Sequence, residues 1–224
     1  MNTAPNLERT IESMLANIKV VSDTESAGRE RARDTRDRFM RAQEFIAKSH
    51  IPPRHLNTPA NEDGSWGKNL NMLKGMVGTG TLSLIIGIRG CGKTQLAVEL
   101  LKHAAHSGYS PLYCTAARIG IELRSAFAKD GSGTTEKTIL KKYTLPRVLV
   151  VDEFGKSNES GYQDVVMFEL LNQRYNEMKD TFLLSNHAVG ELSQHLGASL
   201  LSRIQECGGV VELNNPSFRE GGAK

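Results

Sequence analysis

Residues 87–94 read Gly-Ile-Arg-Gly-Cys-Gly-Lys-Thr and match the pattern G-x-x-x-x-G-K-S/T at every fixed position. Glycines let a backbone turn tightly enough for consecutive amides to point at phosphate oxygens, and a helix that follows adds its positive N-terminal end. A lysine at the seventh position reaches the β- and γ-phosphates, and a hydroxyl at the eighth ligates Mg²⁺. The pattern therefore predicts a loop that binds ATP and Mg²⁺ through the following residues: Gly87, Gly90, Cys91, Gly92, Lys93, Thr94 and Gln95.

The segments around this loop have the pattern of an α/β domain. A short apolar run with β-branched residues, 81–86, precedes the loop, and a helical pattern, 94–107, follows it. Further strands are expected at 111–115, 147–151 and 181–185, and further helices at 117–129 and 162–178. Because strands and helices alternate, we expect a P-loop NTPase fold, in which a central parallel sheet lies between two helical layers.

Two carboxylates, Asp152 and Glu153, directly follow the apolar run Val148–Val151. Ligands of open α/β sheets bind at the carboxyl ends of the strands. We therefore expect Asp152 to hold Mg²⁺ together with Thr94, and Glu153 to polarise the attacking water as a general base. Without the phosphate loop, an ordinary acidic turn would be the better interpretation.

Two further polar side chains are candidates for the same site. Asn186 follows the strand at 181–185 and could bind the attacking water or the γ-phosphate, although a strand-terminal Asn often makes only a local turn. Arg203 lies in a helical stretch and could enter the ATP site of a neighbouring subunit, or it could form a surface salt bridge. The spacing alone leaves these alternatives open.

The composition is ordinary for a globular chain of 224 residues, with 39% hydrophobic and 24% charged residues. No apolar run approaches the ~20 residues that span a bilayer, so we expect no membrane contact. The three cysteines lie far apart, which is typical of a reducing compartment, and we expect a cytoplasmic protein. A net charge of +3 permits binding to nucleic acid but does not require it.

The first fifty residues have a different pattern from the rest. Residues 6–21 place apolar side chains on one helical stripe, and 25–48 form a second, Arg-rich helical pattern. Pro52 and Pro53 cannot continue a helix, and the polar stretch 57–67 reads as a connection. We expect a helical N-terminal segment at 1–50, a linker at 51–68 and an ATPase domain at 69–224. The apolar stripe could dock into a partner, or the two helices could pack on each other.

Taken together, these motifs resemble the AAA+ ATPases of the DnaC/IstB type, which comprise replicative helicase loaders and transposition regulators. The resemblance covers roughly residues 50–220 and rests, beyond the loop, on Val148–Gly155, Leu184–Asn186, Leu196–Gly197, Leu201–Ile204 and Asn215–Arg219. It implies a sensor-1 role for Asn186, a trans-acting arginine finger at Arg203 and a sensor-2 arginine at Arg219. Because few residues follow Arg219 in this sequence, we expect a fold without a large C-terminal lid.

From this resemblance we expect an ATPase that loads a replicative hexameric helicase onto single-stranded DNA. It would self-associate through the ATP site and grip the helicase with its N-terminal segment. The basic residues Arg118, Arg124, Lys129, Lys137, Lys141 and Lys142 could contact DNA or form a solvated face. Two alternatives remain, an IstB-like ATPase that assists transposition and a nucleotide-dependent interaction module with little turnover. Some loaders hold zinc through N-terminal cysteines, whereas this chain has no cysteine before Cys91.

Overall fold

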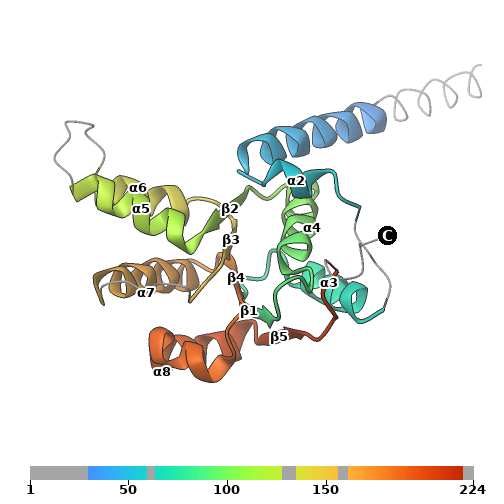
Figure 1. The fold of residues 1–224 in the computed structure, drawn as a ribbon. Helices are drawn as coiled ribbons and strands as arrows, with labels where there is room; N and C mark the ends of the chain where they lie inside the picture. The colour runs from blue at the N-terminus through green and yellow to red at the C-terminus, as the bar shows by residue number, and fades with distance from the viewer. Residues whose placement is uncertain (1–29, 60–63, 128–134, 156–160, 219–224) are drawn as a thin grey trace, which may run out of the picture. The chain divides into compact units, whose positions relative to one another are not determined.

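The fold was analysed in a computed structural model that describes residues 30–59, 64–127, 135–155 and 161–218 (Figure 1). Its internal contacts divide the chain into two units, Met1–Arg41 and Ala42–Lys224. In the first unit, residues 30–41 are helical and exposed. Asp34 and Arg38 form the expected i,i+4 ion pair there, at 2.8 Å. The Arg-rich helix is thus confirmed where it is described, whereas the stripe at 6–21 lies outside the described residues.

Within the described part of the second unit, five strands form one parallel sheet. They are β1 (Leu82–Gly87), β2 (Pro111–Thr115), β3 (Val148–Asp152), β4 (Asp180–Ser185) and β5 (Val210–Leu213). Their order in the sheet is β2-β3-β4-β1-β5, and every neighbouring pair is parallel. This confirms the predicted parallel sheet. The edge strand β5 was not predicted, because its four residues are too few for their alternation between exposed and buried positions to stand out in the sequence.

Helices cover both faces of the sheet, as predicted (Figure 1). One face carries α5 (Ala116–Phe127), α6 (Glu136–Thr144), α7 (Gly161–Asn176) and α8 (Val189–Cys207), and the other carries α3 (Gly64–Met76) and α4 (Lys93–His106). Each face has its own apolar core, because successive residues of a buried strand point to opposite faces. Leu149 and Val151 of β3 thus pack under α5–α8, whereas Val148 and Val150 pack under α3 and α4.

The predicted connection at 57–67 is partly wrong. A short helix, α2 (Pro53–Leu56), precedes it, and α3 already begins at Gly64. Proline stops a helix from continuing but suits its first turn, which explains why Pro53 starts α2. Trp66 is only 2% exposed and packs in the core beneath α4. The predicted linker 51–68 therefore includes core residues, while the domain boundaries themselves stay a prediction.

One buried cation secures the amino-terminal ends of the strands. Arg174 of α7 is fully buried and donates hydrogen bonds to Thr181 Oγ1 and to five backbone carbonyls, those of Tyr143, Thr144, Pro146, Arg147 and Asp180. These carbonyls belong to the end of α6 and to the starts of β3 and β4. Burial lowers the pKa of the guanidinium to about 9. The contacts fix β3 and β4 at the end of the sheet opposite the phosphate loop.

Candidate functional site

The strand order gathers the predicted site residues at one edge of the sheet. The loop 87–94 follows β1, Asn186 follows β4, and Asp152 and Glu153 end or follow β3. Because β4 lies between β1 and β3, Asn186 leaves the sheet between the phosphate loop and the carboxylates. This edge is formed by the carboxyl ends of parallel strands, where ligands of α/β folds bind.

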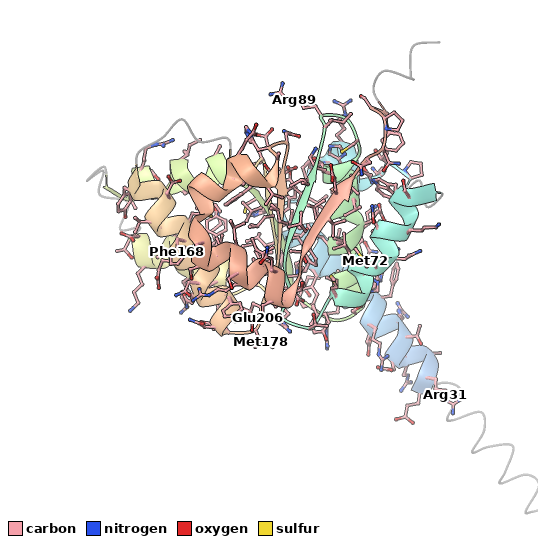
Figure 2. All side chains as sticks on the ribbon, turned by 90° about the horizontal axis from the view of Figure 1, so that it is seen from below. Arg31, Met72, Arg89, Phe168, Met178 and Glu206 are labelled. Carbon is pink, nitrogen blue, oxygen red and sulfur yellow. The ribbon has the colours of Figure 1, made fainter. Side chains whose placement is uncertain are left out.

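The loop has the backbone conformation that phosphate binding requires. Gly90 and Gly92 have φ angles of 87° and 92°, which only glycine adopts readily, and Gly92 is the N-cap of α4. Lys93 is buried, and its ammonium donates to the carbonyl oxygens of Gly87 at 2.6 Å and Ile88 at 2.8 Å. The ammonium is therefore held inside the loop, where phosphate oxygens would replace these carbonyls as acceptors. Figure 2 shows Arg89 at the exposed tip of this loop.

A short hydrogen bond joins the loop to the acidic end of β3. Thr94 Oγ1 donates to Asp152 Oδ2 at 2.8 Å, although 58 residues separate them in the chain. The other carboxylate oxygen, Oδ1, accepts from the backbone N–H of Glu153 at 2.7 Å. A hydroxyl and a carboxylate are the hard oxygen ligands that Mg²⁺ prefers in phosphate sites. The two side chains thus fit a metal bound directly or through its waters.

Glu153 has a strained backbone. Its φ is +58°, a conformation that residues other than glycine rarely adopt. The turn is held by the end of β4, because Phe154 N donates to Leu184 O at 2.8 Å and Ser185 Oγ donates to Phe154 O at 2.7 Å. Such strain persists where the surroundings determine it, and it gathers at functional sites. The end of β4 therefore sets the direction in which Glu153 leaves β3.

A cavity of about 310 Å³ lies beside the first residues of the loop. Gly87 and Ile88 line it together with Asn186 and its neighbour His187. Across from them, β5 and the residues after it contribute Glu212, Leu213, Asn214 and Asn215. His187 Nδ1 lies 2.8 Å from Glu191 Oε2. Asn186 thus lies next to the loop, on its β4 side, as a role at the γ-phosphate requires.

With this geometry in place, similarity to known proteins is informative. The family model described as IstB-like ATP binding protein matches residues 8–222. The chain belongs to this family. It is therefore an ATP-binding protein of the DnaC/IstB type of AAA+ proteins, as the sequence motifs predicted.

This IstB-like protein is also similar to several individual proteins. It is 26% identical over 205 residues to the replicative helicase loader DnaC of Escherichia coli (strain K12), a match that spans 88% of this chain and 81% of that protein. It is 33% identical over 141 residues to the insertion sequence IS5376 putative ATP-binding protein of Geobacillus stearothermophilus. That match spans 61% of this chain and 54% of that protein. A crystal structure of the DnaC helicase loader has a TM-score of 0.62 at 22% identity, over 72% of this chain and 99% of that one. The last comparison supports the fold.

Two predicted nucleotide contacts of this IstB-like protein have side chains that point elsewhere. Cys91 is buried beneath the loop, with its Sγ 3.6 Å from Lys93 Nζ. The amide of Gln95 contacts the segment around α2, lying 3.1 Å from His55 Nδ1 and donating to Thr58 O at 3.1 Å. Contact of either residue with a nucleotide would therefore be made by the backbone. Their assignment stays a prediction.

The two predicted arginines are placed differently. Arg203 lies on α8, where it donates to Asn172 Oδ1 and stacks over the ring of Tyr175 at 4.9 Å, both on α7. This position is consistent with action on another subunit, because its described contacts are with α7 and not with its own phosphate loop. Arg219 lies outside the described residues.

Three aromatic residues at this site were missed by sequence reasoning. Trp66 Nε1 donates to Gly92 O at 3.4 Å, and a Cβ on Gly92 would lie only 3.0 Å from Phe218. Phe218 N also donates to Gly90 O at 3.0 Å, so residues from both ends of the second unit cover the loop glycines. Tyr113 OH donates to Asp152 Oδ2 at 2.8 Å. The signal available was a tyrosine in an apolar strand, since a buried phenol needs an acceptor, but the sequence does not say which one.

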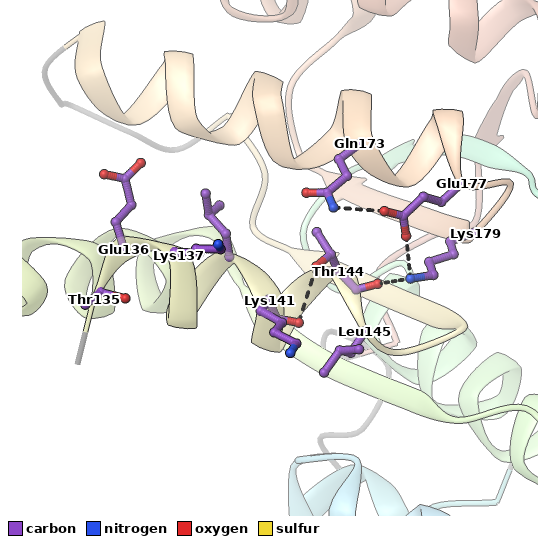
Figure 3. Close-up of a pocket in the computed structure, with 10 residues that line it drawn as sticks. Thr135, Glu136, Lys137, Lys141, Thr144, Leu145, Gln173, Glu177 and Lys179 are labelled. Carbon is purple, nitrogen blue, oxygen red and sulfur yellow. Dashed lines mark hydrogen bonds and ion pairs between the residues drawn. The ribbon is translucent and has the colours of Figure 1, made fainter. Parts of the chain in front are cut away.

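A second cavity, of about 700 Å³, lies between α6 and the end of α7 (Figure 3). Lys137 and Lys141 line it from α6, while Lys179 is already engaged by Glu177 at 2.6 Å and by Thr144 O. None of the predicted nucleotide or metal residues lines it.

Among the described residues, no helix is both long and apolar enough to cross a membrane.

Lys93→Ala is expected to weaken ATP binding by about a hundredfold, because charge-assisted hydrogen bonds are worth about 1.5–3 kcal/mol each. Titration with a fluorescent ATP analogue measures the loss. Lys102→Ala on the same helix is the matched control, since Lys102 pairs with Glu99 at 2.8 Å. Equal affinities of the Lys93 variant and the wild type would contradict the assignment of the loop lysine.

Proposed function

We propose that this chain hydrolyses ATP with Mg²⁺ and uses this reaction to load a replicative hexameric helicase onto single-stranded DNA. The observation that carries the proposal is the hydrogen bond between Thr94 and Asp152, at 2.8 Å, because it joins the phosphate loop to the acidic strand end. The loop alone would account for binding of the nucleotide. The acidic strand end adds the groups that hydrolysis needs.

In the proposed reaction, loop amides and Lys93 bind the phosphates, and Thr94 with Asp152 would hold Mg²⁺. The metal would neutralise charge on the phosphate oxygens. Glu153 orients a water toward the γ-phosphorus and takes its proton as the water oxygen bonds to phosphorus. The bond to the β-phosphate oxygen breaks, so that ADP and phosphate leave. Asn186 contacts the water or the γ-phosphate, and Arg203 of a neighbouring copy stabilises the transition-state charge.

The loader role rests on the extent of similarity to DnaC. That match spans 88% of this chain, so it must include part of the N-terminal segment 1–50 as well as the ATPase domain. In this proposal the N-terminal segment binds the helicase. Single-stranded DNA would contact exposed basic residues of α5 and α6, namely Arg124, Lys137 and Lys141. Contacts with the DNA backbone would be non-specific and sensitive to salt.

A second candidate function is support of a transposase. It is favoured by the insertion-sequence relative, which is 33% identical to this chain. That match spans only 61% of the chain, which makes it less informative about the N-terminal segment. A protein of this kind would bind duplex DNA in an ATP-dependent way. The two functions therefore predict ATP-dependent binding to different forms of DNA, single-stranded DNA for the loader and duplex DNA for the transposition role.

The loader proposal predicts that the intact chain co-purifies with its cognate replicative helicase and increases helicase transfer onto circular single-stranded DNA. A variant lacking residues 1–41 should lose this co-purification but keep ATP binding, because the second unit, which contains the phosphate loop, begins at Ala42. Gel filtration and a helicase-dependent unwinding assay provide the measurements.

The loader role would be refuted by an intact chain that binds no replicative helicase. ATP-dependent binding to duplex DNA would then favour the transposition role, and absence of turnover with either DNA would favour an interaction module.

A further inference from the structure

Tyr113 has a phenol buried in an otherwise apolar layer. The residue is 8% exposed and packs with the core under α4, among Val148, Val150 and Leu184. In the register of β2 and β3, Tyr113 is opposite Val150, and Asp152 is two residues further along β3. Residues two apart in a strand point to the same face. The tyrosine therefore reaches along this face, and its hydroxyl donates to Asp152 Oδ2 at 2.8 Å.

The hydrogen bonds of Asp152 determine how its carboxylate is turned. Oδ2 accepts from both Thr94 Oγ1 and Tyr113 OH, each at 2.8 Å, and Oδ1 accepts from Glu153 N at 2.7 Å. The three donors come from α4, β2 and the turn after β3. Thr94 belongs to the loop that receives the phosphates, and the amide belongs to the strained turn. Tyr113 is thus the donor that comes from neither the loop nor that turn.

The tyrosine is itself held firmly and remains a donor. Its backbone N–H donates to the carbonyl of the buried residue Ser49 at 2.7 Å, on the edge of β2 that faces away from β3. Because its partner is a carboxylate oxygen, the phenol is the donor of this hydrogen bond and presents its hydrogen to Asp152.

We propose that Tyr113 is a positioning residue that holds the carboxylate of Asp152 in the orientation needed to bind the metal of the ATP complex. The inference rests on the proposed Mg²⁺-dependent function of this site. It assigns no direct contact with nucleotide to Tyr113. Removal of its hydroxyl should therefore affect the metal-dependent part of nucleotide binding and leave the metal-independent part unchanged.

The test compares wild type with Tyr113→Phe, which keeps the ring and removes the hydroxyl. Binding of a labelled, non-hydrolysable ATP analogue is measured by fluorescence in EDTA and across a Mg²⁺ titration. The variant should need about tenfold more Mg²⁺ for half-maximal enhancement of binding, because loss of a group that orients a metal ligand typically costs 10–100-fold. Its affinity in EDTA should equal that of the wild type.

Tyr143→Phe is the matched control, because Tyr143 is also buried and its hydroxyl donates to a carboxylate, Glu122 Oε2, at 2.9 Å. This variant should lose thermal stability but keep the wild-type Mg²⁺ dependence. The inference is overturned if Tyr113→Phe titrates like the wild type, if both variants shift alike, or if Tyr113→Phe binds equally weakly with and without metal. A wild type that binds nucleotide without any effect of Mg²⁺ would overturn the proposed function, and this inference with it.

Discussion

Glu153→Gln is expected to lower the turnover number for ATP by about 10²–10⁴-fold, the usual contribution of a general base. Glutamine has nearly the same shape as glutamate and keeps a carbonyl oxygen that can orient the attacking water, but it cannot take up the proton. ATP affinity should change by less than about twofold, because in our proposal the loop amides and Lys93 bind the phosphates. Steady-state phosphate release and equilibrium ATP binding measure the two quantities.

The control for this substitution is Glu177→Gln. Glu177 lies at the end of α7, where it pairs with Lys179 at 2.6 Å. The loss of this partly exposed pair should leave turnover unchanged. If Glu153→Gln hydrolyses ATP as fast as the wild type, Glu153 is not the base. If Glu153→Gln loses ATP binding to the same extent as turnover, the substitution has disturbed the strained turn, where φ of Glu153 is +58°. The assignment of Glu153 as the general base is then not upheld.

Arg203→Ala is expected to lower the assembly-dependent turnover number by about 10³-fold or more. Arginine fingers raise the turnover number by about 10³–10⁵-fold. ATP binding by the isolated subunit should be unaffected, because the described contacts of Arg203 are with Asn172 and Tyr175 of α7. Turnover is measured as a function of protein concentration. The wild type should become more active as the concentration rises, whereas the variant should stay at the level of a monomer.

Mixing of subunits provides a sharper test of action in trans. Lys93→Ala subunits lack the loop lysine but carry Arg203, and Arg203→Ala subunits have the reverse defect. In a mixed assembly, an intact loop can face an intact arginine, so the mixture should regain turnover that neither variant shows alone. Arg54→Ala, which removes an exposed arginine of α2, should behave as the wild type. A mixture without any recovered turnover would contradict the trans assignment.

The phosphate loop and most of the secondary structure were predictable from the sequence. The glycine pattern at 87–94, the apolar strands and the carboxylates after β3 are short-range signals, because turns, strand alternation and helix periodicity each depend on a few neighbouring residues. The predicted strands and helices lie within a few residues of those in the structure. The exceptions are α2, α3, α6, β5 and the part of α8 before the helical stretch around Arg203, and their burial depends on contacts far away in the chain. Trp66 is an example, because its place beneath α4 follows from packing on the loop helix.

The assembly of the site was decided by tertiary structure. No local signal says that β4 pairs with both β1 and β3, yet this pairing puts Asn186 between the loop and the carboxylates. The contact of Thr94 with Asp152 and that of Tyr113 with the same oxygen cross 58 and 39 positions of the chain. Strand order and register depend on how all the apolar faces are buried together, which is a property of the whole domain. The residue types needed for the chemistry can therefore be recognised one segment at a time, whereas their distances exist only once the sheet has formed.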